Sequence, residues 1–298
     1  MSRLLCIVTS LILTGCAATA PNLFIPQREP SAHYLKRVHP QVILVLGSGS
    51  SRGFAHAGVL KVLEDNHIPI DMIVGTSAGS IVGALYADHP SAASLQQLLM
   101  TTHRNEVMDF SLMNIRTGVI SGNQLQRFLI QHMQAKTFEH LTIPFVVVAA
   151  DLDAGSIHVF GSGPIAPAVN ASSAVPPFFR PVQLYGRTYI DGGMIDPVAV
   201  DVAESFHPKI IIAVNLDAPL STSIPSSTPG IFLRGVDMMM SQLNDYSSSH
   251  ADVVIHPKLD EVNMFDGSTR KHLMQAGVVA AEKALPEIKR LLKQKNIS

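Results

Sequence analysis

An apolar run followed at once by a glycine-rich loop and a helical pattern constrains the fold of this chain most. Residues 42–46 (VILVL) contain only valine, isoleucine and leucine, as in a strand buried on both faces. The loop 47–53 (GSGSSRG) follows, and apolar residues then recur at near-helical spacing over 54–66. This order of elements is typical of a parallel sheet with connecting helices.

The same order recurs along the chain. Residues 69–75 (PIDMIVG) predict a second strand, which leads into a helix over 76–87 (TSAGSIVGALYA). Two further interior strands and two shorter ones are expected at 143–152, 208–217, 156–160 and 187–190. We therefore expect an α/β fold with a mostly parallel central sheet and helices on both faces.

Two segments near the C-terminus differ from this pattern. Residues 218–230 (APLSTSIPSSTPG) are rich in serine and proline, so they predict a surface loop or a mobile flap. Residues 273–292 have a helical pattern that Pro286 is expected to interrupt.

The N-terminus has the order of charges and apolar residues found in a secretory signal. Arg3 precedes an apolar stretch over 4–13 that is too short to cross a bilayer as a helix. Leu13-Thr14-Gly15-Cys16 resembles the lipobox of bacterial lipoproteins, in which the signal is cut before the cysteine and the cysteine is acylated. We therefore expect a signal peptide over 1–15 and a lipid anchor on Cys16.

A tether is expected to follow the anchor. Residues 16–40 are largely polar and contain four prolines, which suits an extended link, and the folded domain is expected over 41–298. Ala17 stands where an aspartate often marks retention at the inner membrane, so the resemblance favours the outer membrane of a bacterial envelope.

Composition excludes several other classes. The formal net charge of −1, with acids and bases evenly mixed, leaves no basic stripe for a nucleic acid. The two cysteines are Cys6 and Cys16, so the body has no thiol for a disulfide, a zinc site or nucleophilic catalysis. We expect no metal and no cofactor.

A G-x-S-x-G motif supplies the candidate nucleophile. Gly75-Thr76-Ser77-Ala78-Gly79 lies between a predicted strand and a predicted helix, where a sharp turn forces the serine outward and needs small neighbours. The N-terminus of that helix also favours negative charge nearby. Ser77 is therefore the candidate nucleophile, and it needs a base to take its proton.

Asp191 is the candidate base. The 13 histidines and 23 acids offer many alternatives, but in YIDGGMIDP an apparent strand delivers Asp191 directly into a turn formed by Gly192 and Gly193. An Asp-Gly-Gly turn is common by itself, so the assignment of Asp191 as the base depends on the other motifs.

Taken together, GSGSSRG, GTSAG and DGG resemble in order and local context the three motifs of the patatin-like phospholipases. SSAVPPFF, ahead of the aspartate, is similar to that family's ASxAxPxxF segment. The resemblance extends from about Val42 to the C-terminal helix and is strongest to compact bacterial members. It implies a three-layer fold, a catalytic dyad of Ser77 and Asp191, and an oxyanion hole in the glycine-rich loop. The loop residues are Gly47, Ser48, Gly49, Ser50, Ser51, Arg52 and Gly53.

The loop departs from the family's commoner GGGxRG by having serines where glycines usually stand. Backbone N–H groups would still stabilise an oxyanion. Because φ > 0 is strained for serine, we expect ordinary backbone angles at Ser48 and Ser50 and unusual ones at Gly49 and Gly53. Arg52 matches the family's basic residue, which either steadies the loop or meets a phosphate.

The resemblance implies a serine acyl hydrolase that acts on phospholipids or other acyl-ester lipids through an acyl-enzyme. The loops 105–120 and 218–230 are candidates for covering the site. In the first of them, an apolar surface or plain core packing is expected from Met108, Phe110, Leu112 and Met113.

Three alternatives stay open. A dinucleotide-binding dehydrogenase needs an acid at the end of the second strand, but Asp71 precedes that strand and no tyrosine begins a Tyr-x-x-x-Lys pair. An α/β-hydrolase triad would combine Ser77 and Asp191 with one of His250, His256 and His272. A scaffolding lipoprotein would keep the fold without activity. His56 is expected to be a packed helix residue.

Overall fold

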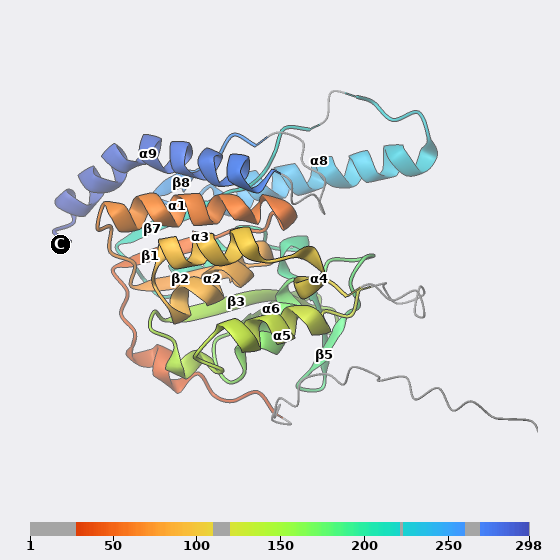
Figure 1. The fold of residues 1–298 in the computed structure, drawn as a ribbon, viewed down its shortest axis with the longest axis horizontal. Coiled ribbons are helices and arrows are strands. Elements are labelled where there is room, and N and C mark those ends of the chain that lie inside the picture. The colour runs from red at the N-terminus through yellow and green to blue at the C-terminus, as the bar shows by residue number, and fades with distance from the viewer. Residues whose placement is uncertain (1–27, 110–119, 221–222, 260–268, 298) are drawn as a thin grey trace, which may run out of the picture.

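The computed structural model describes residues 28–109, 120–220, 223–259 and 269–297 (Figure 1). The expected signal peptide and the proposed lipid-anchor residue Cys16 lie outside these ranges. So do three residues of the expected apolar loop surface, Phe110, Leu112 and Met113. None of the helices in the described part of the chain combines the length and the hydropathy that a bilayer crossing needs.

The described residues form an eight-stranded sheet in the order β5-β6-β3-β2-β1-β7-β8, with β4 paired to β3. Its centre is parallel, and the strands on the β3 side are antiparallel. The strands are β1 (Val42–Leu46), β2 (Met72–Thr76), β3 (Phe145–Asp151), β4 (Ser156–Phe160), β5 (Val182–Leu184), β6 (Arg187–Asp191), β7 (Ile210–Val214) and β8 (Val253–Ile255). The expectation of a mostly parallel central sheet is confirmed.

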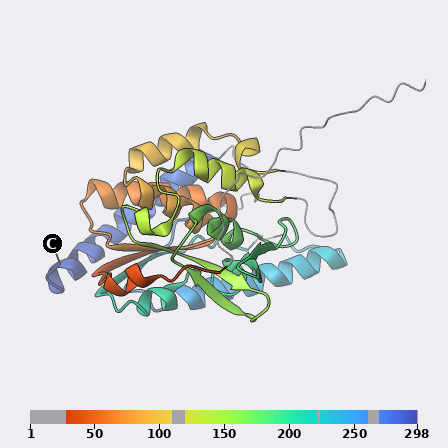
Figure 2. The same cartoon turned by 90° about the horizontal axis from the view of Figure 1, so that it is seen from below.

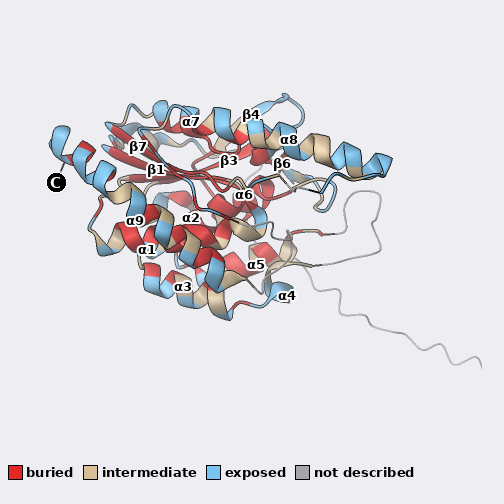
Figure 3. Cartoon of the chain, turned by 90° about the horizontal axis from the view of Figure 1, so that it is seen from above, coloured by how far each residue is buried: buried red, intermediate tan, exposed pale blue. Residues whose placement is uncertain are grey.

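Helices cover both faces of the sheet, as Figure 3 shows for α7 and α8 on one side and α1, α2 and α9 on the other. The helices are α1 (Phe54–Asp65), α2 (Ala78–Asp88), α3 (Ala92–Thr101), α4 (Arg104–Val107), α5 (Asn123–His132), α6 (Ile165–Ser172), α7 (Val200–Glu204), α8 (Thr228–Ser248) and α9 (Arg270–Gln294). Short 3-10 helices occur at His33–Arg37, Ser50–Gly53, Phe138–His140 and Gly192–Met194.

Strand β1 shows why the layers form. Val42, Leu44 and Leu46 point into the larger core beneath the helices α1, α2 and α9. Ile43 and Val45 point to the opposite face, into the smaller core shared with α7. Because successive side chains alternate between faces, an all-apolar strand can be stable only between two covered faces.

Two expectations about helices are wrong. Helix α9 continues through Pro286, because Ala281 before the proline and Ile288 after it are both buried; this packing offsets the roughly 3 kcal/mol that an interior proline costs. The last three residues of the segment 218–230 are not a loop, since α8 begins at Thr228. Ser227 caps that helix by accepting a hydrogen bond from the Gly230 N–H.

The chain ahead of β1 packs on the body. Of the tether expected over 16–40, the structure describes the part from Arg28 onward. The Ser162 hydroxyl donates a hydrogen bond to the Pro30 carbonyl, and Leu35 packs against the smaller core. At the start of the sheet, one carboxylate oxygen of Asp71 accepts hydrogen bonds from the N–H groups of Gln41 and Val42 at 2.8 and 2.9 Å. Asp71 thus secures β1.

Candidate active site

Ser77 lies on a sharp turn between β2 and α2. Its backbone has φ 53° and ψ −118°, a conformation that costs a non-glycine residue about 1–3 kcal/mol. The Ser77 N–H donates to Ser172 Oγ at 2.9 Å, and the Ser77 carbonyl accepts from the Ser80 N–H at 2.9 Å. A Cβ atom at Gly79 would lie 1.9 Å from the Leu46 carbonyl oxygen. The glycine therefore lets α2 begin directly against β1.

Asp191 meets Ser77 although 114 residues separate them in sequence. It ends β6, beside Ala149 of β3, and Ser77 follows the strand on the other side of β3. Ser77 Oγ donates a hydrogen bond to Asp191 Oδ2 at 2.5 Å, and the Gly193 N–H donates to Oδ1 at 2.7 Å. Burial raises the pKa of Asp191 to about 6, although both hydrogen bonds act in the opposite direction.

The glycine-rich loop holds backbone N–H groups ready for an acceptor. The N–H groups of Gly47, Ser48 and Arg52 are used within the fold, since they donate to Val214, Pro197 and Gly49 carbonyls respectively. Within the ranges that the structure describes, the N–H groups of Gly49 and Ser50 have no hydrogen-bond partner. Ser50 and Ser51 line the same cavity as Ser77. The free donors therefore belong to the loop beside the serine.

The backbone of this loop differs from expectation. Ser50 has φ 50°, so the expected ordinary angle is wrong there, whereas Ser48 does not have a positive φ. Gly49 combines φ 170° with ψ 6°, which is neither extended nor helical, whereas Gly53 is right-handed helical with φ −52°, so the unusual angle expected at Gly53 is wrong. At both positions there is also too little space for a side chain. A Cβ atom would lie 2.8 Å from Leu216 Cδ1 at Gly49 and 2.8 Å from Ala78 Cβ at Gly53.

Two basic residues hold the loop in place. His56 is fully buried in α1, and its Nε2 donates to the Gly47 carbonyl at 2.8 Å. Burial lowers the pKa of His56 to about 4, so the ring is neutral near pH 7 and acts as a packed donor, as expected. Arg52 Nε donates to the Gly49 carbonyl at 3.3 Å, a contact within the loop. Burial lowers the pKa of Arg52, although the charges of Asp217 and Asp237 oppose this.

A cavity of about 200 Å³ opens at Ser77. Its wall is mostly apolar and is formed by Phe54, Ile81, Val82, Leu99, Val107, Met108, Leu125, Phe128, Val175 and Phe179. Met108 belongs to the loop expected to cover the site, whereas the described residues of 218–230 do not line the cavity. The apolar wall has the chemistry needed to receive an acyl chain.

One part of the cavity wall is basic. His103, Arg104 and Arg270 line it, and no acidic residue does within the described ranges. Arg270 Nη1 donates to the carbonyls of Leu99 and Thr102 at the end of α3, at 2.9 and 2.6 Å, and its guanidinium lies 5.1 Å from the Phe54 ring centroid. The Nε atom of Arg270 is buried without a partner among the described residues. Two guanidinium groups therefore lie at a cavity wall to which the described residues contribute no carboxylate.

The three histidines of the alternative triad have other surroundings. His250 forms an ion pair with Asp201 at 3.8 Å, and His256 Nε2 makes a 3.1 Å contact with the Asp217 carbonyl. His272 lies on the exposed side of α9. Since Ser77 donates directly to Asp191, no histidine stands between them.

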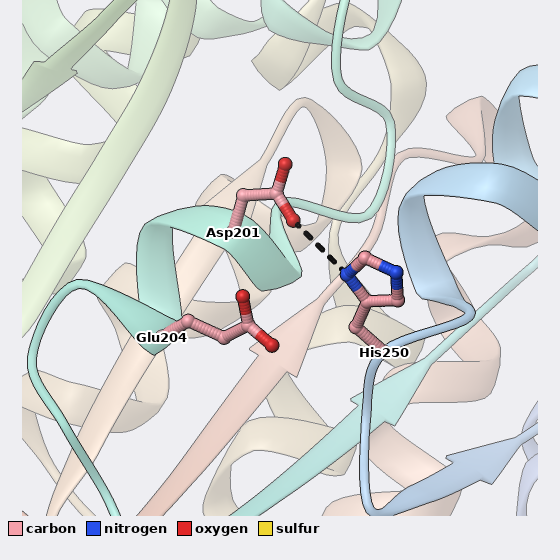
Figure 4. Close-up of side chains that lie close together, drawn as sticks. All are labelled: Asp201, Glu204 and His250. Atoms are coloured by element: carbon pink, nitrogen blue, oxygen red, sulfur yellow. Dashed lines mark ion pairs between the residues drawn. The ribbon is translucent and has the colours of Figure 1, made fainter.

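A group of potential metal ligands lies elsewhere. Asp201 and Glu204 from α7 and His250 after α8 bring ligand atoms within 4.8 Å of one another (Figure 4). All three side chains are exposed, and the ion pair of Asp201 with His250 already accounts for their proximity. The arrangement has no buried ligand and no contact with Ser77, so it has no role in the chemistry of that residue.

Sequence reasoning missed two residues of the site. Ser172 accepts from the Ser77 N–H and donates to the Val148 carbonyl at 2.6 Å, so it ties the turn to β3. Ser172 is the first residue of SSAVPPFF, and the similarity of that segment to the family's ASxAxPxxF segment was the sequence pattern that could have identified it. No sequence pattern identified Arg270 as a site residue, because it reaches the cavity only through the packing of α9 against α3.

Comparison with known proteins agrees with the fold. A family model for patatin-like phospholipases matches residues 44–204. Patatin-like phospholipase domain-containing protein 6 of Mus musculus is 33% identical over 231 residues, which are 74% of this chain and 16% of that protein. An uncharacterized NTE family protein of Mycobacterium tuberculosis is 29% identical over 217 residues, 71% of this chain and 60% of that protein. The chain thus spans less than two thirds of either relative.

Among solved structures, VipD of Legionella pneumophila is similar with a TM-score of 0.52 and 12% identity. The similarity covers 84% of this chain and 67% of the VipD chain, and at this identity it shows a shared fold. Because the family model matches more than half of the residues, the chain belongs to the patatin-like phospholipase family.

Proposed function

We propose that this protein is a serine hydrolase of lipid acyl esters in which Ser77 and Asp191 act as a dyad. One observation carries the proposal: the hydroxyl of Ser77, on its strained turn, donates to a buried carboxylate at 2.5 Å and lines an apolar cavity. A serine hydroxyl becomes a competent nucleophile when a positioned base takes its proton. Asp191 stands at that position.

In the first half of the reaction, Asp191 takes the proton of Ser77 while Oγ attacks the ester carbonyl carbon. The carbonyl oxygen gains negative charge, which the free N–H groups of Gly49 and Ser50 would stabilise. When the tetrahedral intermediate collapses, the bond to the leaving oxygen breaks and Asp191 returns the proton to that oxygen. The acyl group stays on Ser77 as an ester.

In the second half, water attacks the acyl-enzyme and gives its proton to Asp191. The carbonyl oxygen again gains charge beside the loop, and the second intermediate collapses to a free fatty acid. The proton then passes from Asp191 back to Ser77 Oγ. No cofactor is needed to balance either half.

We further propose phospholipids or lysophospholipids as the substrate class. The apolar wall suits an acyl chain, and His103, Arg104 and Arg270 suit the phosphate of a headgroup. A neutral acylglycerol offers these side chains no negative partner. A preference for phosphate-bearing esters over neutral esters with the same acyl chain is therefore expected.

The test compares wild type with Ser77→Ala and Asp191→Asn, first on p-nitrophenyl acyl esters and then on phospholipid, lysophospholipid and monoacylglycerol. Asp196→Asn is the matched control, because Asp196 lies in the same turn region and burial likewise raises the pKa of its carboxyl to about 6, but it makes no contact with Ser77. We expect a loss of at least about a thousandfold in kcat for both site variants and near-normal activity for the control. Full activity in Ser77→Ala would contradict the proposal.

Attachment to a bacterial envelope membrane through acylated Cys16 is also a proposal. It rests on the lipobox-like sequence at residues 13–16 and on the outer-membrane preference indicated by Ala17. Growth with labelled palmitate tests it. The wild-type chain should become labelled, and Cys16→Ser should not.

A further inference from the structure

Helix α8 has an inverted pattern of burial. Of its 21 residues, the two that are buried are polar, Asn244 and Ser248. By contrast, Phe232 is 69% exposed and Met239 is 73% exposed. A helix that packs on a protein core buries its apolar face and exposes its polar one. The helix therefore exposes an apolar surface that this fold does not cover.

The helix is attached at its C-terminal half through polar contacts. Asn215 Nδ2 donates to the Asn244 carbonyl and to Ser248 Oγ at 3.3 and 3.1 Å, and Ser241 Oγ donates to Asp217 at 2.6 Å. The N-terminal half extends beyond the body in both orthogonal views (Figures 1 and 2). Its tip points to the side of the molecule on which α4 lies (Figure 1), and α4 lines the cavity at Ser77.

The apolar residues are spread around the helix in a way that fits a lipid phase better than a groove on a protein. Ile231, Phe232 and Leu233 are 56%, 69% and 60% exposed. Because each residue of a helix turns about 100°, three consecutive residues occupy more than half of its perimeter. A groove on a protein covers one face of a helix, whereas a lipid phase surrounds an inserted helix end on all sides.

The charges agree with a lipid surface. Between Asp217 and Asp237 the only charged residue of the sequence is Arg234, one position after the apolar triplet. An arginine at that place can reach phosphate groups while the triplet lies among acyl chains. Ile224, just ahead of the helix, is 85% exposed and extends the apolar tip.

We infer that the N-terminal end of α8, residues 228–234, inserts into the surface of a phospholipid membrane. The insertion is independent of an acyl group on Cys16, and it brings the cavity at Ser77 close to the lipid. This goes beyond the proposed hydrolysis, since α8 would bind lipid whether or not Ser77 reacts.

The sequence contains no tryptophan, so one introduced tryptophan reports its own surroundings. We would prepare full-length Phe232→Trp in a Cys16→Ser background and add vesicles of diether phosphatidylcholine and phosphatidylglycerol, which an esterase cannot cleave. The emission should shift to shorter wavelength, and lipids brominated on their chains should quench it. Val279→Trp is the matched control, because Val279 is 56% exposed on α9; its emission should not change.

A triple variant, with Ile231, Phe232 and Leu233 all changed to serine, should bind the same vesicles on the order of a hundredfold more weakly. Its turnover of a water-soluble p-nitrophenyl ester should stay at the wild-type level, which separates this result from any failure of the proposed function. An unshifted Phe232→Trp spectrum with vesicles would overturn the inference. So would a shift that follows protein concentration without lipid, because a second copy of the chain would then cover α8.

Discussion

The carboxyl group of Asp191 is buried and receives two hydrogen bonds, from Ser77 Oγ and from the Gly193 N–H. Burial raises its pKa to about 6, and only the ionised form can accept the proton of Ser77. We therefore expect kcat/KM on a non-ionising ester to fall about tenfold per pH unit below about 6 and to level off above it. A pH–rate profile checks this, and an inflection near 4 would contradict it.

The same residue predicts a stability effect. A folded-state pKa above the unfolded value of 3.8 means that the folded protein loses stability as the pH rises from about 4 to about 6. Asp191→Asn removes this cost, so it should unfold at a higher temperature than wild type at pH 8, by an amount corresponding to about 3 kcal/mol, and gain little at pH 4. Thermal unfolding of both proteins at the two pH values provides the measurement. An equal gain in unfolding temperature at pH 4 and at pH 8 would show that packing, and not the ionisation of Asp191, causes the difference.

His56 acts on the reaction through the loop. Its Nε2 is bonded to the Gly47 carbonyl, two residues before the free N–H of Gly49. His56→Phe keeps the volume and leaves that buried carbonyl unpaired, so kcat should fall on the order of tenfold with little change in KM. His56→Gln restores a donor and should recover most of the activity. The pH profile above 5 should not move in either variant, because the wild-type ring stays neutral there. A shifted profile would instead make His56 a base.

At the scale of elements, the contact of α1 with α9 depends on two glycines. A Cβ atom at Gly58 would lie 1.9 Å from the Met274 carbonyl oxygen, and one at Gly277 would lie 2.0 Å from the Ala55 carbonyl oxygen. The two helices therefore touch backbone to backbone. This contact fixes the position of α1, whose N-terminus follows the glycine-rich loop directly.

Gly58→Ala should therefore destabilise the fold by about 3 kcal/mol, because the backbone of α9 has to move. Gly235→Ala is the control, since it lies inside α8 with no atom within 4 Å of the added Cβ. That substitution should be neutral or stabilise the protein by up to about 1 kcal/mol, through helix propensity. Denaturant unfolding of the three proteins distinguishes these outcomes. Equal midpoints for Gly58→Ala and wild type would show that the helices can separate without cost.

The strands show which parts of the structure could be predicted from sequence. Segments such as 42–46 and 143–152 are apolar on both faces, a pattern that few other elements share, and the structure confirms the parallel sheet. The end of β2 could also be placed, because GTSAG marks the turn at Ser77. These features are local in sequence.

The features that could not be predicted depend on distant contacts. Pro286 stays within a helix because of burial around it, and Arg270 reaches the cavity through contacts 168 and 171 residues away in sequence. The backbone of Ser50 is another example. Its φ of 50° occurs in a loop whose Gly49 lies against Leu216, a contact across many residues that no pattern within the loop reveals.

At the scale of the whole molecule, the two proposed attachments to the membrane predict a specific result in cells. One acyl-modified cysteine near the N-terminus and one apolar helix end would act together, and a single weak attachment gives only reversible binding. In a bacterial host, Cys16→Ser should leave part of the protein in the membrane fraction, in a form that salt and dilution release. The variant with serine at 231, 232 and 233, in which Cys16 is unchanged, should stay anchored in the membrane fraction. Both changes together should release it, and a fully soluble Cys16→Ser protein would show that α8 contributes nothing to membrane binding.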